Sequence, residues 1–123
     1  MAKSASDACI DGGLTYISEN AAKIYVCTTV AMSTFADVSS EALTTGSAVT
    51  SANLVIGVGD SSGRKIAVAA QSSLSVSVTG TAGQIAVVSS DALMIVTTCT
   101  TQALTTGNTV TIPTWDIEIA DPT

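Results

Sequence analysis

Short stretches in which apolar residues occupy every second position recur along this chain, and they constrain its fold more than any other feature. Alternation of this kind is typical of β-strands that bury one face. About eight such stretches follow one another at a spacing of roughly 8–12 residues, with turn-forming residues between them. The pattern predicts a mainly β protein, built as an antiparallel β-sandwich or a jelly-roll-like barrel. The expected strands cover residues 24–30, 54–58, 64–70, 74–78, 85–88, 93–98, 110–112 and 115–119.

The connections between these strands contain the small and polar residues that tight turns favour. Residues 31–52 are small and polar throughout, and we expect one or two short strands and a long loop there. Pro113 cannot donate to a strand ladder, so its strand is expected at a sheet edge or to be bulged. The apolar positions shift by one residue after Pro113, as a β-bulge would produce. The expected turns lie at residues 57–63, 80–83, 89–91 and 105–108, and the last two predict hairpins.

A helical periodicity replaces the alternation in the first part of the chain. Ser4 followed by Asp7 fits an N-cap with an acidic residue three positions later. We therefore expect one N-terminal α-helix over about residues 5–20, and two adjacent glycines make it dependent on a partner surface. The length suits a single domain, with a helical segment at 1–22 and a β-sandwich at 23–123. One stripe of the helix is apolar, at Ile10, Leu14, Ile17 and Ala21.

Charge and composition exclude several classes of function. The formal net charge is −6 at pH 7, so we expect neither binding of nucleic acid through neutralised phosphates nor binding of a membrane through basic residues. The chain has no histidine, the commonest general base and metal ligand. Its cysteines are not paired at the close spacing typical of metal sites. We therefore expect no enzymatic activity, no cofactor and no metal.

The surface expected for this chain suits burial in an assembly. Ser and Thr are abundant, whereas only 11% of the residues are charged. Ser and Thr lose less rotamer entropy on burial than Lys, Glu or Arg. Sheet edges with few lysines are also poorly protected against pairing with another chain. Both features favour a protein whose surface is covered by neighbouring subunits.

The last expected strand and the cysteines supply the candidate contact residues. Asp116 and Glu118 share one strand face and are expected to meet solvent or a partner. A single tryptophan in an alternating strand indicates either core or a subunit interface. The three cysteines are an odd number, which leaves them as free thiols or as a cross-link between neighbouring subunits. The interface candidates are Trp115, Asp116, Glu118 and Asp121, and the disulfide candidates are Cys9, Cys27 and Cys99.

Several segments of the chain match a known pattern, most clearly Ser62–Ile66, Thr79–Ala82, Val96–Cys99 and Ala103–Pro122. In these segments the chain resembles a family of small virion structural proteins of tailed bacteriophages, the capsid decoration or cement proteins. The resemblance spans nearly the whole chain, because it includes the N-terminal MAKS, the helix after it and the strand Lys23–Cys27. The chain departs from the family pattern at Gln84–Ser90, which leaves the role of that strand open.

The resemblance implies a structural role without catalysis. The expected partners are the major capsid protein and further copies of this chain, as a dimer or trimer, with no nucleic acid and no membrane. The first residues show no secretory signal, so we expect synthesis in the host cytoplasm and a final location on the capsid surface of the virion. Two alternatives remain open: another virion component, such as a head fibre base, tail tube or tail-tip protein, and a carbohydrate-binding module.

Overall fold

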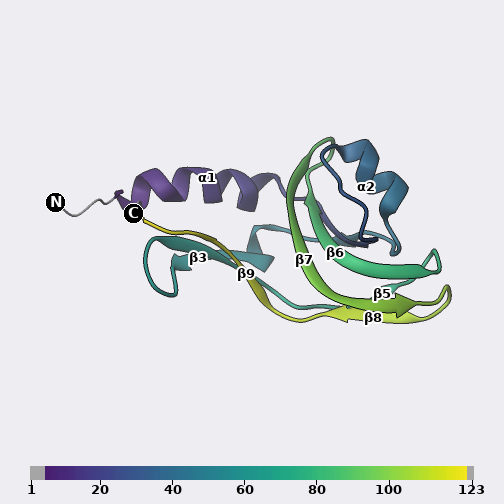
Figure 1. Cartoon of the computed structure of the whole chain (residues 1–123). Helices are drawn as coiled ribbons and strands as arrows, with labels where there is room; N and C mark the ends of the chain where they lie inside the picture. The colour runs from purple at the N-terminus through teal and green to yellow at the C-terminus, as the bar shows by residue number, and fades with distance from the viewer. Residues whose placement is uncertain (1–4, 122–123) are drawn as a thin grey trace.

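The alternating segments form antiparallel sheets, as the sequence predicts. The computed structural model describes residues 5–121, and in this range it has nine strands and two α-helices (Figure 1). The strands form three sheets with the orders β2-β1-β6-β7, β3-β4-β9 and β5-β8. The prediction of a mainly β fold with an N-terminal helix is confirmed. The strands are β1 (Lys23–Cys27), β2 (Ser47–Ala48), β3 (Leu54–Val58), β4 (Arg64–Val68), β5 (Gln71–Ser75), β6 (Gly80–Val88), β7 (Leu93–Leu104), β8 (Thr109–Ile112) and β9 (Trp115–Ile119).

Helix α1 (Asp7–Asn20) lies along the β3-β4-β9 sheet, and we call these elements the helix-covered end of the molecule (Figure 1). The predicted apolar stripe packs into the core, with Leu14 fully buried. Ser18 is also buried, and its hydroxyl donates to the carbonyl of Leu54 at 2.9 Å. Ser4, the predicted N-cap, lies outside the described residues; the observed cap is Ser6, whose Oγ accepts from the backbone N–H of Cys9.

The register of the β3-β4-β9 sheet separates two kinds of side chain. Residues in register across antiparallel strands point to the same face. The row through Ile66 on β4 joins Ile56 and Ile117 and faces α1. The row through Lys65 joins Gly57 and Glu118 and lies on the opposite face. The helix therefore covers one face of this sheet, while the other carries Lys65, Asp116 and Glu118.

The four-stranded sheet, with α2, β5 and β8, makes up the strand-rich end of the molecule, and its strand β6 is buried on both faces (Figure 1). Every residue of β6 from Ala82 to Val88 is buried. Val26 and Val87 belong to the main core, while Cys27 and Val88 form a second cluster beneath α2. A strand buried on both sides loses the strict alternation that makes strands easy to recognise.

Helix α2 (Phe35–Glu41) overturns the prediction of only short strands and loop over residues 31–52. A reciprocal capping box starts the helix, because Thr34 Oγ1 accepts from the N–H of Asp37 and the Asp37 carboxylate accepts from the N–H of Thr34. Val38 anchors the helix on the second core cluster. A short strand, β2, and a 3₁₀ turn at Ser51–Asn53 complete the segment.

The structure contradicts one predicted turn and confirms another. Residues 80–83 were expected to form a turn but begin β6. The glycines there are required by close packing, since a Cβ on Gly83 would clash with Thr29 and one on Gly80 would approach Leu43 at 2.9 Å. The turn at 105–108 does form, with Gly107 at a φ of +94° and the N–H of Asn108 donating to the carbonyl of Thr105.

The strands flanking that last turn do not pair with each other, so the predicted final hairpin is wrong. β7 pairs with β6, and β8 pairs with β5. At Pro113 the chain then leaves the β5-β8 sheet and enters the β3-β4-β9 sheet. The expectation of an edge strand at Pro113 is confirmed, but the shift in apolar positions comes from this change of sheet and not from a bulge.

Candidate functional site

The face of β9 that carries Asp116 and Glu118 is engaged within the molecule. Lys65 Nζ lies 2.6 Å from Asp60 Oδ1 and 3.0 Å from Asp116 Oδ2. These hydrogen bonds raise the pKa of Lys65 above its ordinary value. Glu118 accepts a long hydrogen bond, 3.4 Å, from the backbone N–H of Asp60. The two acidic side chains share one face as predicted, but they stabilise the β3–β4 turn and leave little charge free for a partner.

Arg64 and Asp121 complete the polar contacts of the helix-covered end. Arg64 Nε donates to Asp11 Oδ1 at 2.8 Å, and its Nη2 donates to Asp11 Oδ2 at 3.3 Å, so the guanidinium joins α1 to β4. The hydrogen bond from Asp11 raises the pKa of Arg64. The backbone N–H of Asp121 donates to Ser62 Oγ, which ties the chain after β9 to the β3–β4 turn.

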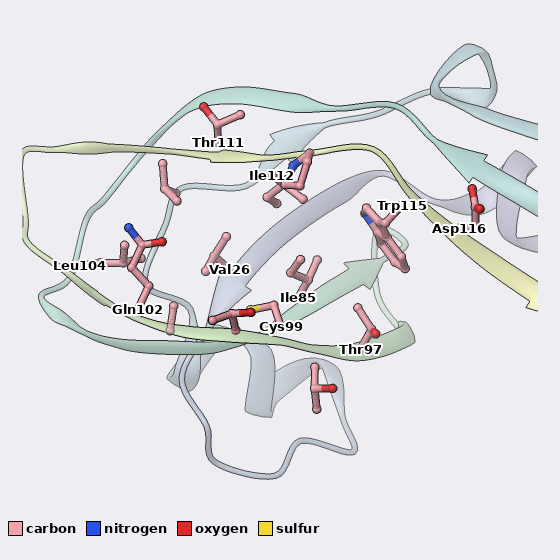
Figure 2. Close-up of a pocket in the computed structure, with 15 residues that line it drawn as sticks. Val26, Ile85, Thr97, Cys99, Gln102, Leu104, Thr111, Ile112, Trp115 and Asp116 are labelled. Atoms are coloured by element: carbon pink, nitrogen blue, oxygen red, sulfur yellow. The ribbon is translucent and has the colours of Figure 1, made fainter.

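Trp115, the remaining interface candidate, points to the opposite face of β9 and lines a cavity. This cavity, which we call the groove, has a volume of about 440 Å³. Figure 2 shows Ile112 and Trp115 on one side of it and Thr97 and Cys99 on the other. The indole ring is half-buried, and its Nε1 is fully buried without a hydrogen-bond partner. A buried donor left unpaired is costly, because it has lost its hydrogen bond to water.

The groove opens between two strands that each have an unpaired edge. Among the described residues, β7 pairs only with β6, and β8 pairs only with β5. The lining is mostly apolar, threonine or amide, and Asp116 at one end is its only charged residue. Between Asp91 and Asp116 the chain has no charged residue at all. The groove is therefore a neutral, partly apolar slot bounded by backbone groups that can still form a ladder.

The three cysteines differ sharply in accessibility. All three are free thiols: Cys9 is exposed on α1, Cys27 is buried and Cys99 is half-buried on β7. Burial raises the pKa of Cys27 to about 12, and the nearby carboxylate of Glu41 adds to the effect. Burial also raises the pKa of Cys99. A disulfide between subunits stays a prediction, and Cys9 is the most exposed of the three cysteines.

Sequence reasoning selected Trp115 but missed the rest of the groove. The residues of β7 and β8 that line it are ordinary strand residues, and only the fold brings them together. The signal available in the sequence was the neutral stretch from residue 92 to residue 115. The ion pairs of Arg64 and Lys65 were also missed, because they depend on strand register and on the placement of α1.

Neither α1, with 14 residues, nor α2, with 7, is long and apolar enough to span a bilayer. Residues 5–121 contain no group of three or more His, Cys, Asp or Glu side chains placed to hold a metal ion. A scan against models of protein families and searches of curated proteins and of solved structures gave no match to this chain.

Proposed function

We propose that this chain is a non-enzymatic structural protein of a phage virion that binds and stabilises the major capsid lattice as a decoration or cement protein. Its strand-rich end would be an incomplete β-sandwich, with the β2-β1-β6-β7 sheet facing β5 and β8 and an open side at the groove. The resemblance of the sequence to small virion proteins supports this reading. So does the distribution of charge in the fold, which is the observation that carries the proposal.

Charge is concentrated at the helix-covered end. Strands β5 to β8 carry no charged side chain, and the loop residue Asp91 is the only charged residue between Lys65 and Asp116. Covering a charged group costs far more desolvation free energy than covering a hydroxyl or a methyl group. Strands β5 to β8 are therefore the part of the surface that a neighbouring subunit can cover at the lowest cost. Repeated copies on a symmetric shell would add avidity to a modest single contact.

Co-sedimentation with capsids that lack this protein, followed by electron microscopy of the pellet, tests the proposal. We expect saturable binding at regular lattice positions and a higher melting temperature of the decorated shell. An absence of binding at saturating protein would contradict the capsid role. Rings or tubes formed by the purified protein would instead favour a tail component.

A pair of matched variants tests which end meets the shell. Thr111→Glu places a charge on the exposed side of β8, at the strand-rich end. Ser61→Glu places the same charge in the exposed β3–β4 turn, at the helix-covered end. We expect the first change to weaken binding at least about tenfold, because it buries a carboxylate, and the second to leave binding unchanged. The reverse result would show that the helix-covered end faces the capsid.

A further inference from the structure

We draw no further inference here: the strongest candidate, the neutral groove between β7 and β8, is bounded by strand edges that pair with no other strand of residues 5–121, and nothing in the structure shows what covers it.

Discussion

Eight charged side chains lie on α1, on the β3-β4-β9 sheet and in its β3–β4 turn, whereas strands β5 to β8 carry none. At the helix-covered end, Arg64 joins the helix to the sheet and Lys65 bridges two carboxylates on the other face. At the strand-rich end, backbone ladders and aliphatic contacts hold the sheets, and a groove remains open beside Trp115.

The two ends therefore satisfy their polar groups in different ways. The helix-covered end pairs most of its charged side chains within the chain, while the Nε1 of Trp115 on β9 has no partner. At the strand-rich end, strands β5 to β8 carry no charged side chain, and the outer edges of β7 and β8 pair with no other described strand. Intramolecular ion pairs make a surface self-sufficient, whereas neutral open edges make it available to another chain. We infer that the first end maintains the fold and the second meets a partner.

The largest expected contrast between the ends is in packing. Ile66 is fully buried between α1 and the sheet, whereas Ile85 borders the groove. Replacing either by Ala should cost about 2–5 kcal/mol of unfolding free energy, with Ile66→Ala near the top of that range and Ile85→Ala near the bottom. The difference arises because the side chain of Ile85 already has open space beside it. Urea denaturation of the two variants measures it, and equal losses would show that the groove is as tightly packed as the helix interface.

Alkaline pH should weaken the strand-rich end through Cys27. Its pKa is raised by burial to about 12 in the folded protein, against 9.0 for a free thiol. Because the folded pKa is the higher one, the stabilising contribution is complete below pH 9 and is lost as the pH rises towards 12. Over that interval the unfolding free energy should fall by about 1.4 kcal/mol per pH unit.

The same titration in Cys27→Ala isolates this contribution. That variant should lose the part of the pH dependence that belongs to the thiol, while Cys9→Ala, on the exposed side of α1, should keep it. Lys65, whose pKa is also raised, remains intact in both variants and cancels from the comparison. Identical slopes in the wild type and in Cys27→Ala would mean that Cys27 is accessible to solvent at high pH.

The sequence revealed those parts of the fold that one element specifies alone. The α1 stripe and the strands at 54–58 and 115–119 were predicted because a single buried face imposes its period on the residues. Helix α2 was not predicted from the sequence, because it buries only Val38 fully and its segment is otherwise small and polar. Its capping box, Thr34 with Asp37, was the available local signal.

These local sequence patterns do not indicate which strands pair when the strands are far apart in the sequence. Leu104 and Thr109 flank a good turn, and nothing local indicates that β8 pairs with β5 instead of β7. The pairing of β8 with β5 separates β8 from β7, and the groove lies between these two strands. Trp115 was identified as a candidate from its residue type, but its unpaired N–H depends on that same tertiary arrangement.

A smaller effect should come from Arg64, which links α1 to β4. Arg64→Met keeps the aliphatic length but removes the hydrogen bonds to Asp11, and we expect the melting temperature to fall by a few degrees. Lys65→Met removes the ion pairs on the outer face and should cost less, because no helix depends on them. High salt should narrow the difference, since it screens exposed charges. If the two variants melted together in low salt, Arg64 would not be joining the helix to the sheet.

The smallest expected contrast concerns the helix caps. Thr34→Ala should cost about 1 kcal/mol, because α2 has seven residues and depends on its capping box. Ser6→Ala should cost less, since Ser6 accepts one long hydrogen bond of 3.3 Å and burial of Ile10 and Leu14 holds α1 in place. Amide hydrogen exchange distinguishes the two variants. Thr34→Ala should exchange faster in α2 alone, and Ser6→Ala should change little in α1. The control Thr34→Ser retains a capping hydroxyl and should exchange like the wild type. A larger loss of unfolding free energy in Ser6→Ala would mean that α1 depends on its first turn more than on its packing. It would contradict the inference that packing at the helix-covered end maintains the fold.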